Sequence, residues 1–258
     1  YRQEFLCEFI DESTAFLTHD QIVACVDPLL CAHASSAPLI DDPRDLFVGV
    51  DIGRHHDLTV LWVLARTNPS RDCEGAVENS TLNAFALKKC HDMAPEFTTV
   101  AIIELAAAPF TEQSAVLDEL LRIPNVRRCC IDAGGIGMQL AEQTVEKFGP
   151  HRVEPITFTL ATKSQLATAL RIAVETRKIR IPNDDRVRND WHSLERTITG
   201  AGQFRLNAAR RDGSHADRFW AAALALRAAG TCGAGGFAFG PIDWMPGSRL
   251  AYARGGTW

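Results

Sequence analysis

Three aspartates in this sequence lie where a folded chain can present carboxylates to a ligand. Asp51 ends the apolar run LFVGVDIG and Asp132 ends the apolar run VRRCCIDA, and each precedes a glycine that lets a ligand approach the backbone. Asp217 begins the helical pattern SHADRFWAAALALRAA, where apolar neighbours at i+3, i+4 and i+7 turn it toward the core. Three carboxylates in one place repel one another, and hard divalent cations such as Mg²⁺ relieve that repulsion.

Each of these aspartates also has a purely structural explanation. An aspartate at a strand end often caps a turn, and Ser214 with Asp217 fits a capping box, in which the carboxylate returns to the backbone of the cap residue. The three together are therefore more specific than any one of them.

Five further residues are weaker candidates. Asp57 and His215 are candidates for supporting the three aspartates, although a solvated turn residue and a surface histidine are the simpler interpretations. Arg54 and Lys163 are candidates for contacts with a DNA backbone, since phosphate contacts need only positioned cations. Glu104 lies within a strand-like run and is expected to face solvent.

The elements that would position these residues begin as strands and end as helices. A short connection makes the first two strands antiparallel, whereas helical crossovers make the later ones parallel. The expected strands are 46–53, 58–65, 98–107, 126–133 and 153–158, and the expected helices are 110–123 (N-cap Thr111), 135–149, 162–178, 185–198 and 214–229. This order predicts an α/β fold with a mixed five-stranded sheet flanked by helices.

Composition limits the classes of protein to consider. The chain has 258 residues, of which 46% are hydrophobic and 23% charged, which is typical of a globular domain. We expect an N-terminal arm or linker at 1–45, a domain at 46–230 with a polar excursion at 66–95, and a flexible glycine- and aromatic-rich tail at 231–258. The net charge of -5 argues against a protein that coats DNA through broad electrostatics. No apolar run approaches the ~18 residues that a membrane span needs.

Three motifs, in this order, resemble the C-terminal nuclease domain of phage terminase large subunits, most nearly the Mu-like group. The motifs are VGVDIG, CCIDAGGIGMQLAEQ and GSHADRFWAAALAL, and the opening YRQEFLCEFID resembles the junction between the terminase ATPase domain and the nuclease. The resemblance covers about residues 1–229. It implies an RNase H-like fold and a metal-dependent endonuclease that hydrolyses phosphodiester bonds of concatemeric double-stranded DNA.

The resemblance also implies the roles of the three acids. Asp51 would bridge two ions, Mg²⁺ or Mn²⁺, Asp132 would hold one ion and Asp217 the other, and water would be the nucleophile. The middle acid of the family is often glutamate, so Asp132 has a reach shorter by one methylene. The implied partners are double-stranded DNA, an ATPase domain earlier in the same parent chain, a portal protein and a small terminase subunit, with no membrane. The implied location is the host cytoplasm, for a phage or prophage protein.

Two other functions remain open at this point. DIG and IDAGG also resemble the phosphate loops of actin-like and sugar-kinase-type nucleotide-binding enzymes. However, the sequence has no GxxxxGK[ST], so we expect no ATPase motor in this chain. Alternatively, the chain is a docking module in which the acids are structural.

Overall fold

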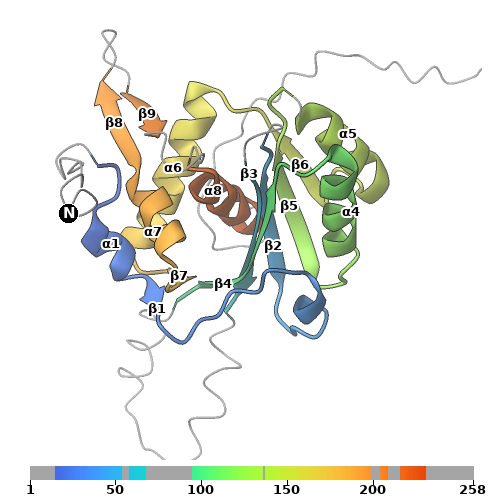
Figure 1. The fold of residues 1–258 in the computed structure, drawn as a ribbon, viewed down its shortest axis with the longest axis horizontal. Coiled ribbons are helices and arrows are strands. Elements are labelled where there is room, and N and C mark those ends of the chain that lie inside the picture. Colours follow the sequence, from blue (N-terminus) through green and yellow to red (C-terminus); the bar gives the residue numbers. More distant parts are fainter. Residues whose placement is uncertain are drawn as a thin grey trace, which may run out of the picture.

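The computed structural model describes residues 15–53, 58–67, 95–135, 137–198, 204–208 and 216–230. Within these segments, seven strands form one mixed sheet in the order β1-β7-β4-β3-β2-β5-β6, with helices on both faces (Figure 1). The strands of this sheet are β1 (Val26–Asp27), β2 (Leu46–Asp51), β3 (Leu58–Arg66), β4 (Phe97–Ala106), β5 (Val126–Asp132), β6 (Val153–Ile156) and β7 (Ile179–Pro182). β2, β3 and β4 form an antiparallel meander, and the other neighbours in the sheet are parallel.

Helices and a small second sheet complete the described part of the chain. The helices are α1 (His19–Val23), the 3-10 helix η1 (Ala37–Leu39), α4 (Phe110–Leu121), α5 (Gly137–Phe148), α6 (Leu160–Glu175), α7 (Asp185–His192) and α8 (Asp217–Gly230). β8 (Leu194–Ile198) and β9 (Phe204–Ala208) pair as an antiparallel two-stranded sheet.

The predicted α/β architecture is confirmed, but the sheet has seven strands in the described segments rather than five. The two additional strands, β1 and β7, pair with each other at one edge of the sheet. They contain two and four residues, which is too short for apolar alternation to reveal them in the sequence.

Two local predictions were wrong. The helix expected at 185–198 ends at His192, because the chain from Leu194 onward pairs with β9. The buried Leu194 continues the helical spacing of Val187, so the apolar pattern alone could not reveal the change. The N-cap of α4 is Pro109 rather than Thr111, and its backbone carbonyl accepts the first hydrogen bonds of the helix.

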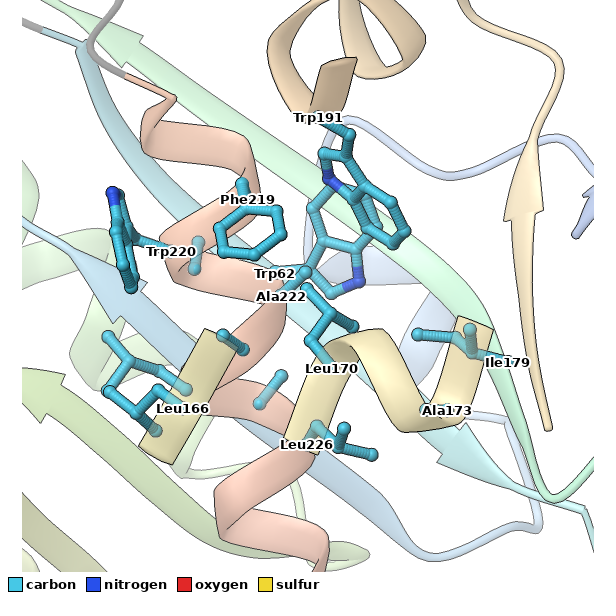
Figure 2. Packing of buried hydrophobic residues seen from close by; sticks show 14 of the residues in the cluster. Trp62, Leu166, Leu170, Ala173, Ile179, Trp191, Phe219, Trp220, Ala222 and Leu226 are labelled. Atoms are coloured by element: carbon cyan, nitrogen blue, oxygen red, sulfur yellow. The ribbon is translucent and has the colours of Figure 1, made fainter. Parts of the chain in front are cut away.

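Alternate residues of the central strands face two separate cores. On β2, Val48 and Val50 pack toward α4 and α5, whereas Phe47 faces the core beneath α6, α7 and α8. Figure 2 shows this second core, in which Trp62 of β3 lies beside Trp191 of α7. Trp191 is fully buried and Trp220 nearly so, so both pack in the core.

The last helix, α8, is buried along almost its whole length. Its residues from Asp217 to Ala229 are all buried, and six of the helix positions are alanine. Small side chains let the helix approach the sheet, and at Gly49 of β2 the backbones nearly touch. A Cβ at Gly49 would lie 2.0 Å from the Ala221 carbonyl oxygen and 2.2 Å from the Ala225 nitrogen.

The N-terminal part of the described chain contributes to the same core. Phe16, Leu17 and Ile22 lie within the 1–45 stretch and are buried against the residues under α8. Among the helices that the structure describes, none combines the length and apolar character that crossing a membrane requires.

Candidate metal centre

Asp51 and Asp132 end neighbouring parallel strands at the same edge of the sheet. β2 and β5 are in register through Gly49 with Cys130 and Val50 with Ile131, so the next position on each strand is an aspartate. Asp51 and Gly49 point to the same face, because side chains two residues apart on a strand do so. This is the face that α8 covers.

The packing of α8 brings Asp217 toward these two residues. Gly49 meets the helix at Ala221, and Asp217 lies one helical turn before Ala221. Asp51 lies two residues beyond Gly49 along the strand. The close approach of α8 to β2 therefore places Asp217 near the end of the strand that carries Asp51.

The charges of the three carboxylates act on one another. Burial raises the pKa of Asp51 well above its ordinary value, and the negative charges of Asp217 and Asp132 raise it further. Asp51 is only 8% exposed, so water screens this repulsion poorly. A cation at this place would stabilise the ionised form of Asp51.

Asp132 is less buried and has a defined local partner. Its Oδ1 accepts a hydrogen bond from the Gly134 backbone N–H at 2.9 Å. Burial raises the pKa of Asp132 to about 6, although this hydrogen bond and the charge of Lys163 act in the opposite direction. Asp132 is therefore ionised at neutral pH and can serve as an oxygen ligand.

Lys163, in the first turn of α6, is a cation whose charge reaches two of the acids. Its ammonium lies 5.0 Å from the centroid of the Phe158 ring and 4.7 Å from that of a Trp220 ring, which are cation–π distances. Its charge lowers the pKa of both Asp51 and Asp132. Lys163 also lines an open pocket of about 240 Å³ together with Arg205 of β9.

The donor set fits a hard divalent cation in kind, since carboxylate oxygens are the ligands that Mg²⁺ and Mn²⁺ prefer. In the part of the chain that the structure describes, no three His, Cys, Asp or Glu side chains are grouped closely enough to surround one ion. The three aspartates therefore converge without forming a closed three-ligand cage.

Several residues singled out in the sequence lie outside the described segments. They are Arg54 and Asp57 between β2 and β3, and Ser214 and His215 before α8. Of the weaker candidates that lie within the described segments, Lys163 is the one whose charge acts on the acids.

The contacts of three residues were not anticipated from the sequence, and these residues form one network at the start of α8. Glu104 of β4 was expected to face solvent, but it accepts a hydrogen bond from the buried Arg218 at 2.7 Å. Asp190 of α7 accepts a hydrogen bond from the backbone N–H of Arg218 at 2.9 Å, and its charge adds to the raised pKa of Asp51. A charged residue in the otherwise apolar strand TTVAIIELAA was the available signal, because a partly buried carboxylate needs a partner.

Comparison with known proteins identifies the family of this chain. A family model described as the terminase RNaseH-like domain matches residues 96–229, just over half of the chain. No curated protein matches the chain.

Solved structures give the same fold. The large terminase nuclease from thermophilic phage G20c with bound magnesium has a TM-score of 0.58 and 18% identity, covering 82% of this chain and 96% of that one. The same nuclease with bound cobalt has a TM-score of 0.55 and 16% identity, with the same coverage of both chains. The large terminase nuclease domain of Thermus phage P74-26 has a TM-score of 0.54 and 16% identity, covering 86% of this chain and 98% of that one. At these identities the likeness establishes the RNase H-like fold, which confirms the predicted fold class.

Proposed function

This chain belongs to the family of terminase RNaseH-like domains, and we propose that it is a divalent-metal-dependent endonuclease that cuts double-stranded DNA during phage DNA packaging. The observation that carries the proposal is the convergence of Asp51, Asp132 and Asp217 at one edge of the sheet. The negative charges of the other two raise the pKa of the buried Asp51. The solved nucleases of this fold include structures with bound magnesium and with bound cobalt.

We assign the three carboxylates to two ions, Mg²⁺ or Mn²⁺. Asp51 ends β2, which pairs with the strand of Asp132 and packs against the helix of Asp217. Asp51 would therefore contact both ions, while Asp132 and Asp217 would each contact one. Each ion would then be held by a pair of protein carboxylates. When bound, the ions supply Lewis acidity, which lowers the pKa of water and stabilises negative charge on the phosphodiester.

The protein's own residues position the acids and the DNA. Asp132 is oriented by the Gly134 N–H, and the Lys163 ammonium lies against the Phe158 and Trp220 rings, where its charge acts on Asp51 and Asp132. We propose that Lys163 contacts a phosphate beside the scissile bond, and that Arg54 does so from the turn after β2. Such contacts fix the backbone without reading bases, so we expect little sequence preference.

The wider biological setting is proposed from the family. The parent protein would be a terminase large subunit of a phage or prophage, most nearly of the Mu-like group, with an ATPase domain preceding this domain. It would act in the host cytoplasm with a portal protein and a small terminase subunit on concatemeric DNA. Asp57 and His215 are proposed to support the acids, and the domain boundaries at residues 45 and 230 stay predictions.

A plasmid-cleavage assay tests the proposed activity. Supercoiled plasmid should be nicked and linearised with Mg²⁺ or Mn²⁺ and remain intact in EDTA. Asp51→Asn should abolish cleavage, because it removes one carboxylate ligand while preserving side-chain shape. The matched control is Asp45→Asn, immediately before the first residue of β2, where Asp45 accepts a hydrogen bond from Arg127 at 2.6 Å.

The outcomes separate the alternatives. Cleavage by Asp45→Asn but not by Asp51→Asn supports the proposal, and full activity in EDTA or with Asn at position 51 contradicts it. A folded wild-type chain that neither cuts DNA nor binds Mn²⁺ would instead be the docking module. Tight ATP binding by the chain alone would favour the actin-like alternative.

A further inference from the structure

Arg218 is buried at the start of α8, directly after Asp217. Its side chain is only 10% exposed, which is unusual for a guanidinium, because moving a charge out of water is costly unless it is paired. Two acidic residues from other elements supply the pairing. They are Glu104 on β4 and Asp190 on α7.

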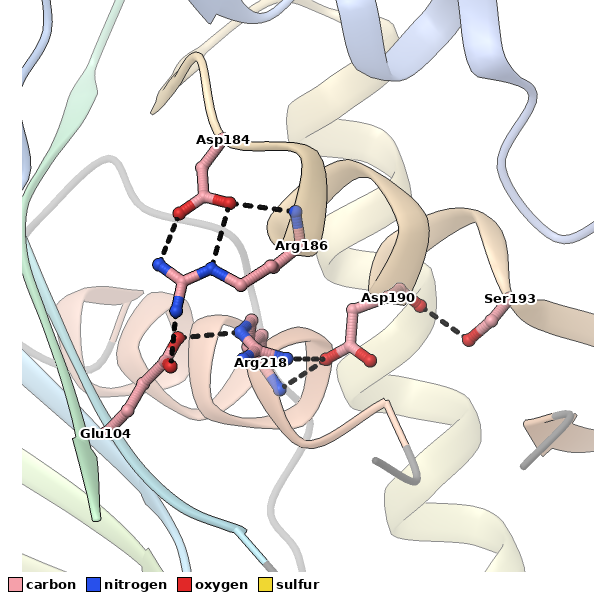
Figure 3. A network of polar contacts seen from close by, with 6 residues as sticks. All are labelled: Glu104, Asp184, Arg186, Asp190, Ser193 and Arg218. Carbon is pink, nitrogen blue, oxygen red and sulfur yellow. Dashed lines mark hydrogen bonds and ion pairs between the residues drawn. The ribbon is translucent and has the colours of Figure 1, made fainter. Parts of the chain in front are cut away.

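The contacts of Arg218 join three elements in one network (Figure 3). Its Nε donates to Glu104 Oε1 at 2.7 Å, and one terminal nitrogen lies 3.6 Å from Asp190 Oδ2. The other oxygen of Glu104 accepts a hydrogen bond from Arg186 at 3.0 Å, and Arg186 is in turn paired with Asp184 at 2.7 Å. Because both oxygens of Glu104 are engaged, its carboxylate has a fixed orientation toward Arg218.

The network also holds the backbone beside Asp217. The backbone N–H of Arg218 donates to Asp190 Oδ2 at 2.9 Å, and this N–H belongs to the peptide group that joins Asp217 to Arg218. Ala216, the preceding residue, has a φ of 63°, a conformation that L-residues adopt only at a cost. The turn that leads into α8 is thus strained at Ala216, and the hydrogen bond from the Arg218 N–H to Asp190 helps to hold it in place.

We infer that Arg218 is a positioning residue that fixes Asp217 for metal binding through its contacts with Glu104 and Asp190. The inference rests on the proposed function, because it assigns Arg218 a task at the same metal centre. Arg218 itself would not contact metal or DNA. It would hold the first turn of α8 so that the Asp217 carboxylate faces Asp51.

The same helix offers a matched control. Arg227 lies near the other end of α8, is also buried, and donates to Glu154 Oε1 through Nε at 3.0 Å and through a terminal nitrogen at 2.5 Å. Arg218 and Arg227 therefore share residue type, helix, burial and partner type. They differ in distance from Asp217, so a purely structural role would give the same phenotype at both positions.

The experiment compares Arg218→Gln, Arg218→Lys and Arg227→Gln in the full chain. Mn²⁺ affinity is measured by titration calorimetry, the Mn²⁺ concentration for half-maximal plasmid cleavage is measured separately, and thermal unfolding in EDTA reports stability. Residues that orient metal ligands typically contribute roughly 10–100-fold to affinity or activity, so Arg218→Gln should weaken Mn²⁺ binding within that range. Arg218→Lys should recover part of the loss, and Arg227→Gln should lower stability while keeping the wild-type Mn²⁺ affinity.

Two results would overturn the inference. One is a folded Arg218→Gln with wild-type Mn²⁺ affinity and cleavage, and the other is an equal loss of affinity in Arg227→Gln. If Arg218→Gln does not fold, Glu104→Gln takes its place, since it preserves shape and removes the charge that Arg218 shares with Arg186. Unchanged Mn²⁺ affinity in Glu104→Gln would then refute the inference. A wild-type chain that neither binds Mn²⁺ nor cuts DNA would instead refute the proposed function and the inference with it.

Discussion

Replacing Asp132 with asparagine should stabilise the metal-free protein at neutral pH. In the folded chain, burial raises the pKa of Asp132 from its ordinary value of 3.8 to about 6. The Asp132 carboxyl therefore binds its proton more tightly in the folded state than in the unfolded state. As a result, the free energy of unfolding falls as the pH rises from about 3.8 to about 6. Above about pH 6 the full stability difference is lost. The difference between the two pKa values corresponds to about 3 kcal/mol of unfolding free energy.

Asparagine avoids this penalty and keeps the local hydrogen bond. Its amide oxygen can accept the Gly134 N–H that Asp132 Oδ1 accepts at 2.9 Å. Burying an amide still has a cost, so we expect a net gain of about 1–3 kcal/mol for Asp132→Asn. The gain should shrink below about 1 kcal/mol near pH 4, where the carboxyl is largely protonated in the folded state.

Urea unfolding in EDTA at about pH 7.5 and at about pH 4 measures both quantities. The control is Asp184→Asn, because the hydrogen bonds and charge of Arg186 outweigh partial burial and hold the pKa of Asp184 below its ordinary value. Asp184→Asn should therefore lose stability at neutral pH, the opposite sign. An Asp132→Asn variant that is no more stable than wild type at about pH 7.5, or equally stabilised at both pH values, would refute the reasoning.

Three further outcomes follow from the same structure. Gly49→Ala should destabilise the fold by about 1–3 kcal/mol or more, because the new Cβ meets the backbone of α8. The same shift of α8 should weaken Mn²⁺ binding. Unchanged thermal unfolding would contradict this prediction. Lys163→Gln should raise the pH at which Mn²⁺ affinity is half-maximal, because the ammonium lowers the pKa of Asp132; the same midpoint as wild type would count against a role for Lys163. Trp191→Ala should cost about 3–5 kcal/mol in urea unfolding, because the fully buried ring contacts both Trp62 and Phe219, and a loss below about 1 kcal/mol would show that the cavity collapses.

The central strands and the helices that cross between them could be predicted from sequence because their patterns are long. β2 and β3 are apolar through almost every position, and α6 repeats apolar residues on one face. β1 and β7 have too few residues for a periodic pattern. Their place at the sheet edge comes from tertiary pairing, which no local pattern records.

The candidate site divides in the same way. Asp51 and Asp132 stand out because they end apolar strands, and Asp217 because it begins an apolar helix. Arg218 and Glu104 are 114 residues apart in the chain, and a single sequence carries no signal that pairs them. These placements and the resemblance together predict the convergence of the three aspartates. In the structure it depends on the contact between Gly49 and α8.

The burial of α8 also bears on how the protein exchanges its amide hydrogens with solvent. An element enclosed from Asp217 to Ala229 has no exposed side from which it can fray, so its amides should exchange mainly through opening of the whole domain. The small β8–β9 sheet, in which the paired residues Thr197 and Arg205 are exposed, should exchange through local opening instead. Asp217 is thus attached to a segment whose motion is tied to global unfolding. Hydrogen-exchange mass spectrometry should therefore find a long-lived protected peptide at 217–229 even without metal.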